Sequence, residues 1–124
     1  MISLAPLKEK DKINLFFSKA NLDANENSGC VAATQNGEVL GFCLYDLTKD
    51  KMIIRYIEPL NDLALADGIL RSTLHVAAEK SIMNAFYADT ANEEFFAKLG
   101  FIKDKSEKSL KIEKLFESCC SCKN

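Results

Sequence analysis

Residues 89–101 read DTANEEFFAKLGF, and this stretch decides how the second half of the chain is interpreted. Thr90 and Glu93 have the spacing of a capping box, in which a hydroxyl and a carboxylate bind free amides at the start of a helix. Three apolar residues then share one helix face: Phe95, Phe96 and Leu99. Gly100 stands where helices commonly end in the left-handed conformation, and Phe101 can pack beneath it. The stretch therefore predicts a short capped helix that a glycine terminates.

Length and charge limit what the chain can be. With 124 residues it is large enough for one domain, which we assign to residues 1–118, followed by a cysteine-rich tail at 119–124. The formal net charge is −2, and among sixteen basic residues only Arg55 and Arg71 are arginines. Nucleic-acid backbones select a basic, arginine-rich face, so we expect no nucleic-acid partner.

The cysteines indicate the compartment. No apolar run reaches the length of a membrane helix, and the first residues lack the basic and then apolar order of a secretory signal, so we expect a cytoplasmic protein without a membrane partner. Cys30 and Cys43 lie in strand-like apolar runs and are predicted to be reduced core thiols. The tail thiols, at 119, 120 and 122, fit a disordered tail, a metal site completed by a second chain or another cysteine, or a redox-active group. No metal site is assigned.

Hydrophobic periodicity predicts a mixed α/β domain. Asn36-Gly37 is a strong hairpin signal, because both central positions of that turn require positive φ. The expected strands are residues 2–4, 30–34, 38–47, 52–57, 85–88 and 110–116. The expected helices are residues 6–20, a helix capped by Asn61 or Asp62 that ends near 80–81, and the helix that Gly100 terminates. The order is β-α-β-β-β-α-β-α-β, with three successive strands forming an antiparallel meander.

This order, together with a helix that ends in Lys-Leu-Gly-Phe after a strand, resembles the GCN5-related N-acetyltransferase (GNAT) fold. The resemblance spans the chain apart from a shortened first helical region. It implies a mixed, mostly antiparallel central sheet with helices on both faces. Residues 65–71, LADGILR, also resemble a turn in a divergent subgroup of small bacterial members. The family implies acetyl-CoA as co-substrate and an amine of a small molecule or peptide as acceptor.

The resemblance also implies where the coenzyme would lie. In the family, the pantetheine amides pair with the strand that corresponds to residues 52–58. The backbone amide near Ile57 would then bind the oxyanion, and the pyrophosphate would rest on the amino end of the helix at Asp62. Free amides and the helix dipole favour phosphate there, although the Asp62 carboxylate adds negative charge.

The family pattern at that helix end is Gln or Arg, two residues, Gly, one residue, then Gly or Ala. It falls on Asn61, Ala64 and Ala66, of which only Ala66 matches. A methyl at Ala64 stands where backbone must approach the pyrophosphate, and Asp67 adds negative charge close to it. Gly68 costs about 1 kcal/mol relative to alanine inside a helix, so it marks close approach of a ligand or of a neighbouring strand.

Acetyl transfer needs a base for the ammonium, a donor for the oxyanion and often an acid for the thiolate. Family members often carry that acid as a tyrosine four residues before the glycine, where this chain has Phe96. The thiolate then leaves unassisted, Tyr87 serves as donor, or the reaction is not performed. Glu58 is our candidate base, the alternative being a merely exposed strand end. The family's asparagine falls on Asp89, with Asn92 three residues later.

Three hypotheses follow. The first is an N-acetyltransferase that uses acetyl-CoA. The second keeps the fold without catalysis, as an acyl-CoA-binding or regulatory module, and the losses at Ala64 and Phe96 favour it. The third is a metal- or redox-responsive protein that uses the tail cysteines. The sequence leaves a homodimer open as the assembly.

Overall fold

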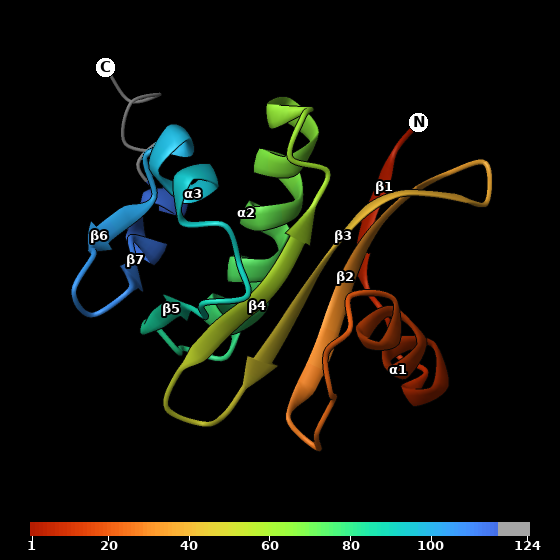
Figure 1. The fold of residues 1–124 in the computed structure, drawn as a ribbon, viewed down its shortest axis with the longest axis horizontal. Coiled ribbons are helices and arrows are strands. Elements are labelled where there is room, and N and C mark those ends of the chain that lie inside the picture. Colours follow the sequence, from red (N-terminus) through yellow and green to blue (C-terminus); the bar gives the residue numbers. More distant parts are fainter. Residues whose placement is uncertain (117–124) are drawn as a thin grey trace.

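The computed structural model describes residues 1–116 and consists of one twisted sheet with helices packed on it (Figure 1). The helices are α1 (Lys10–Lys19), α2 (Leu63–Glu79), α3 (Glu93–Leu99) and a 3-10 helix η1 (Ile112–Phe116). The strands are β1 (Ser3–Pro6), β2 (Ser28–Gln35), β3 (Glu38–Leu47), β4 (Met52–Glu58), β5 (Ala85–Tyr87), β6 (Ile102–Asp104) and β7 (Ser109–Leu110).

The sheet has the order β1-β2-β3-β4-β5-β7-β6, and every neighbouring pair is antiparallel except β4 and β5. The predicted meander is confirmed as β2, β3 and β4. Asn36 and Gly37 join the first two strands with φ of 53° and 83°, as the turn requires. The parallel pair is possible because α2 carries the chain from β4 back to β5.

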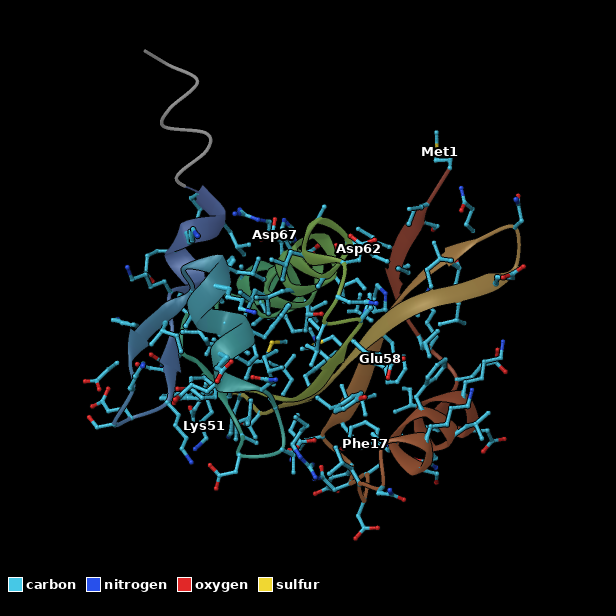
Figure 2. All side chains as sticks on the ribbon, turned by 45° about the horizontal axis from the view of Figure 1, so that its top comes forward. Met1, Phe17, Lys51, Glu58, Asp62 and Asp67 are labelled. Atoms are coloured by element: carbon cyan, nitrogen blue, oxygen red, sulfur yellow. The ribbon has the colours of Figure 1, made fainter. Side chains whose placement is uncertain are left out.

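Each face of the sheet has its own apolar core. Successive residues of a strand point to opposite faces. Accordingly, Cys30 and Ala32 of β2 join a smaller cluster with α1, whereas Val31 and Ala33 join a larger cluster with α2 and α3. Figure 2 shows the side chains that fill these two layers. Helices on both faces were predicted, and this prediction is confirmed, as are the fully buried positions of Cys30 and Cys43.

Helix α2 begins where predicted. The Asp62 side chain accepts a hydrogen bond from the Leu65 amide at 3.2 Å, which satisfies one free donor of the first turn. The buried face consists of Ala66, Ile69, Leu70, Thr73, Leu74 and Ala77. Leu63, the first residue of the helix, is exposed.

Helix α3 ends as predicted but begins differently. Gly100 is left-handed with φ of 76°, and the Phe101 amide donates to the Phe96 carbonyl at 3.0 Å. The predicted capping box is wrong. Asn92 is the N-cap and accepts from the Phe95 amide at 3.4 Å, because the helix begins at Glu93 and leaves Thr90 outside it.

The two ends of the chain also depart from the prediction. Pro6 pairs with Val31 as the last residue of β1, so α1 starts only at Lys10. Of the predicted strand at 110–116, only Leu110 lies in a strand, β7; the rest is wrong, since the Lys111 amide donates to the Phe101 carbonyl at 2.7 Å and the chain turns into η1. Strand β6 was not predicted. The cysteine tail lies outside the described residues, and within residues 1–116 no helix has the length and apolar character needed to cross a bilayer.

Candidate functional site

Strands β4 and β5 stop pairing halfway along β4. Against β3, the pairing of β4 continues to Glu58, which lies opposite Phe42. Against β5, it stops at Ile54 and Tyr87 after only three residue pairs. Figure 1 shows β4 running well beyond the end of β5. Among the described residues, no strand therefore pairs with residues 55–58 on the β5 side, and we call this the free edge of β4.

A β-bulge marks the point where the strands part. Leu44 pairs with Tyr56 and the next residue, Tyr45, pairs with Ile54, so Arg55 is an extra residue in β4. Bulges bend a strand and increase its twist, which turns the rest of β4 away from β5. Alternate residues of a strand direct their backbone groups to the same edge, and the Arg55 carbonyl faces the β5 side. The amide of Ile57 is thereby placed on the free edge.

Gly41 lets the far end of β4 close on β3. A Cβ at Gly41 would meet the Glu58 carbonyl oxygen and the Pro59 Cδ at 2.6 Å each, so only glycine fits there. We had not singled out this residue from the sequence. An isolated glycine inside a predicted strand is the signal that could have found it, because such a glycine often marks close backbone approach.

Glu58 ends β4, and its half-buried carboxylate accepts a hydrogen bond from the Tyr56 hydroxyl at 2.8 Å. This bond raises the pKa of Tyr56, and burial adds to the effect. Because Tyr56 lies two residues away on the same strand face, it holds the carboxylate in place. Figure 2 shows Glu58 on the side of the sheet that α1 covers in part. Tyr56 is a second residue that our sequence analysis missed.

Tyr87 forms the last residue pair of the β4–β5 ladder, with Ile54, and is only 3% exposed. Its hydroxyl donates to Glu93 Oε1 at 2.7 Å, and burial raises its pKa to about 12. The Phe96 ring stacks on it with centroids 5.1 Å apart. The proton of Tyr87 is therefore committed to a carboxylate in the first turn of α3.

The amino end of α2 follows the free edge directly, because only residues 59–62 separate Glu58 from the helix. Asn61 and Ala64 are exposed around this end, whereas Ala66 is fully buried and turned into the core. The first turn contains no basic residue. The Asp62 carboxylate occupies the Leu65 amide, so one of the amides that would face an anion already has an acidic partner.

Two further residues of α2 have partners within the fold. Asp67 pairs with Arg71 at 2.9 Å. A Cβ at Gly68 would meet the Leu4 Cδ1 of β1 at 3.5 Å, an ordinary contact, so the neighbour of this glycine is the first strand. Between β1 and α2 lies a groove of about 370 Å³, which is lined by Ile2, Leu4, Asp62, Ala64, Leu65 and Gly68.

Solved structures with this architecture identify the fold. The ribosomal-protein-alanine N-acetyltransferase of Brucella melitensis biovar Abortus 2308 superposes with a TM-score of 0.59 at 11% identity, over 80% of this chain and 90% of its own. The ribosomal-protein-S18-alanine N-acetyltransferase of Escherichia coli gives 0.58 at 13% identity, over 88% of each chain. YhhK of E. coli, assigned as an N-acetyl transferase and solved bound to coenzyme A, gives 0.52 at 16% identity, over 82% of this chain and 87% of its own.

The chain has the GNAT fold. Its sequence matches no family profile, and no curated protein matches it at a significant level. The likeness is therefore one of architecture, which includes the mostly antiparallel sheet that the resemblance implied.

Within the GNAT fold, the predicted site residues fall into two groups. Ile57 and Glu58 lie on or beside the free edge of β4, and Tyr87 lies at its inner end. Asn61 and Ala64 surround the adjoining helix end. Of the other candidates, Gly68 lines the same groove as Ala64, and Phe96 stacks on Tyr87 in the core. Ala66 is buried in the core, Asp67 pairs with Arg71, and Asn92 caps α3.

Three sequence candidates in or just before α3 have partners within the fold. Asn92 uses its side chain to cap the helix, and Asp89 forms an ion pair with Lys108. Phe96 is fully buried, between the rings of Tyr87 and Phe95. Phe96 is thus a core side chain.

Both cysteines in the described part of the chain are buried thiols. Burial raises the pKa of both the Cys30 and the Cys43 thiol to about 12, which keeps them protonated and inert at neutral pH. No group of three His, Cys, Asp or Glu within residues 1–116 is arranged to hold a metal ion. The predicted tail thiols lie beyond these residues.

Proposed function

We propose that this protein binds acetyl-CoA along the free edge of β4 and transfers the acetyl group to an amine of a small molecule or peptide. The observation that supports the proposal is the early end of the β4–β5 ladder. Within the described part of the chain, it leaves residues 55–58 without a strand partner on the β5 side. A chain of amides such as pantetheine can pair there as an added strand would.

The chemistry then follows from three positions. The amide of Ile57 faces the thioester and donates to its oxygen as negative charge develops. Glu58, which Tyr56 orients, accepts the proton of the incoming ammonium. The amine nitrogen bonds to the carbonyl carbon and releases a second proton to solvent, the carbon–sulfur bond breaks, and the electron pair leaves on sulfur. The thiolate departs unassisted, because Phe96 has no proton to give and Tyr87 donates to Glu93.

The neighbours support an amine acceptor and this coenzyme. Two of them are alanine N-acetyltransferases of ribosomal proteins, and the structure of a third holds coenzyme A. We expect the acceptor amine to arrive on the side of the sheet where Glu58 lies.

A second candidate is a GNAT-fold module that binds an acyl-CoA without transferring the acyl group. Two observations favour it. Phe96 replaces the acid of the family, and the Asp62 carboxylate sits on the amide where a pyrophosphate would rest. Both candidates require the free edge of β4 and differ only in turnover.

Coenzyme binding is the first test. Coenzyme A at about 1 mM, hundredfold above a Kd of about 10 µM, should stabilise the native state by about 2.7 kcal/mol. The melting temperature should then rise by about 10 °C. Adenosine 3′,5′-bisphosphate, which lacks the pantetheine arm, should give a much smaller rise. No rise with coenzyme A would rule out both candidates.

Turnover separates them. Acetyl-CoA consumption with a panel of amines should fall at least about hundredfold in Glu58→Gln if Glu58 is the base. Glu38→Gln is the matched control, because Glu38 is exposed at the start of β3 and outside the site. Binding without turnover in the native protein would select the binding module. Equal turnover in both variants would remove Glu58 from the mechanism.

A further inference from the structure

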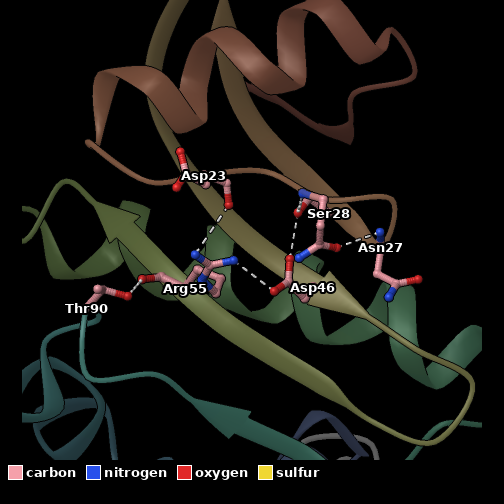
Figure 3. Close-up of polar contacts among 7 residues, drawn as sticks. Asp23, Asn27, Ser28, Asp46, Arg55 and Thr90 are labelled. Atoms are coloured by element: carbon pink, nitrogen blue, oxygen red, sulfur yellow. Dashed lines mark hydrogen bonds and ion pairs between the residues drawn. The ribbon is translucent and has the colours of Figure 1, made fainter.

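Arg55 connects the bulge of β4 to three other parts of the chain (Figure 3). Its Nη1 donates to Asp46 Oδ2 of β3 at 2.9 Å, and its Nη2 donates to the Asp23 carbonyl at 3.5 Å in the loop between α1 and β2. Its backbone carbonyl accepts from the Thr90 hydroxyl at 2.6 Å, in the loop between β5 and α3.

The Arg55 side chain is held firmly. The ion pair with Asp46 is mostly buried, since the two side chains are 20% and 15% exposed. Asp46 also accepts from the Ser28 hydroxyl at 2.7 Å, and the guanidinium lies 5.7 Å from the centre of the Phe17 ring. Removing one member of a mostly buried pair leaves the other charge unpaired, so this anchor resists displacement.

Thr90 binds the backbone carbonyl of Arg55. The last rung between β4 and β5 runs from the Ala88 amide to the Ile54 carbonyl at 2.8 Å. A regular parallel ladder would continue with the backbone amide of Thr90 donating to β4. Here the Thr90 hydroxyl donates to Arg55 instead, so a side chain stands where the next backbone rung would form. This contact satisfies the carbonyl of the bulge without drawing β5 further along β4.

We propose that Arg55 and Thr90 are positioning residues that fix the point at which β4 and β5 separate. Arg55 fixes the bulge from the α1 side, and Thr90 ends the ladder from the β5 side. The proposal rests on the proposed function for its consequence, which is correct placement of the Ile57 amide toward a thioester. Its structural content is independent of any ligand. Neither residue was part of the site predicted from the sequence.

The structural content is tested by amide hydrogen exchange in the ligand-free protein. Thr90→Val keeps the shape of the side chain and removes the donor. Protection of the Ala88 amide should fall about fivefold, which corresponds to one hydrogen bond. Thr90→Ser should restore it. Thr48→Val is the matched control, because the Thr48 hydroxyl likewise donates to a backbone carbonyl, that of Lys51 at 3.3 Å, but in the β3–β4 turn.

The functional content is tested by steady-state kinetics or, for a binding module, by the Kd of coenzyme A. Thr90→Val should raise the KM or the Kd for the coenzyme about fivefold while kcat stays within twofold. Arg55→Lys should do the same, because lysine cannot reach Asp46 and the Asp23 carbonyl with one planar group. Thr48→Val should leave both constants unchanged.

The outcomes separate the two proposals. If Ala88 protection is equal in the Thr90→Val and Thr48→Val proteins, the positioning role is overturned whether or not coenzyme A binds. If protection falls only in Thr90→Val while the native protein binds no coenzyme A, the positioning role stands and the proposed function fails. A coenzyme KM or Kd that rises equally in both valine variants also overturns it.

Discussion

The free edge of β4 and the amino end of α2 are neighbouring halves of one candidate site, and they are built by different means. The free edge depends on backbone geometry: a bulge at Arg55, an early end to the β5 ladder and a glycine at position 41. The helix end depends on which side chains surround it. There the Asp62 carboxylate already occupies an amide, and no basic residue lies in the first turn.

The difference shows which features of a fold survive divergence in sequence. The order of the strands is set by the packing of the whole sheet, so a single side chain has little influence on it. The charge at a helix end can be altered by one substitution at little cost to the fold. The free edge of β4, which we call the strand half of the site, therefore follows from the GNAT architecture. The amino end of α2, the helix half, depends instead on the side chains that surround it.

The largest effect should come from breaking the strand half at Phe96. Phe96→Ala removes a fully buried ring that stacks on Tyr87 beneath the inner end of the free edge. We expect the free energy of unfolding to fall by about 3–5 kcal/mol in urea denaturation, from the lost apolar burial and the cavity left behind. Phe116→Ala, at an exposed ring, should cost less than about 1 kcal/mol. Similar losses in the two variants would contradict the assignment of Phe96 to the core.

Alkaline pH should lower the free energy of unfolding, because buried Cys43 and Tyr87 beside the free edge of β4 lose their protons on unfolding. Burial raises the pKa of Cys43 from 9.0 to about 12 and that of Tyr87 from 10.0 to about 12. The unfolded chain releases these protons first, so the stability they give is present below about pH 9 and is lost as the pH rises toward 12. Each such group contributes a slope of up to about 1.4 kcal/mol per pH unit.

Urea denaturation at several pH values between 8 and 11 measures this slope. Cys43→Ala removes one of the groups and should flatten the fall relative to the native protein. A variant at an exposed acid, Glu38→Gln, should keep the native slope. Stability that is unchanged up to pH 11 would show that these groups are not shifted by burial.

The sequence predicted those parts of the fold and of the site that depend on local chemistry. Asn36-Gly37 and Gly100 were found because their positive φ is a property of one or two residues. The Asp62 cap was found for a similar reason. The bulge at Arg55 was not, because its cause is a shift in register between β3 and β4 that no single residue type in either strand signals.

The errors have the same origin. Thr90 has the spacing of a cap, yet its hydroxyl reaches a carbonyl 35 residues away in sequence. Residues 110–116 alternate like a strand, yet the Lys111 amide finds its acceptor at Phe101 and the chain turns. In both cases a hydrogen bond to a residue elsewhere in the fold outweighed the local pattern. A single sequence shows the pattern but not the hydrogen-bond acceptor.

A smaller effect on coenzyme A binding is expected at the amino end of α2. Asp62→Asn keeps a side-chain oxygen that can cap the Leu65 amide, so stability should change by less than about 0.5 kcal/mol. Removing the negative charge from the helix end should tighten coenzyme A binding about fivefold, which corresponds to about 1 kcal/mol. Isothermal titration would measure the change. Pantetheine, which lacks the pyrophosphate, should bind equally to both proteins, and an equal gain for both ligands would contradict the placement of the pyrophosphate.

The smallest effect concerns Gly68, one turn further into α2. Because a Cβ there would make only an ordinary contact with Leu4, Gly68→Ala should gain helix propensity without strain and raise the free energy of unfolding by about 0.5–1 kcal/mol. Gly100→Ala is the control with opposite sign, because φ of 76° is strained for alanine. Urea midpoints would measure both. If Gly68→Ala is stabilising but weakens coenzyme A binding, the ligand itself approaches this glycine, and the helix half extends one turn beyond its capped end.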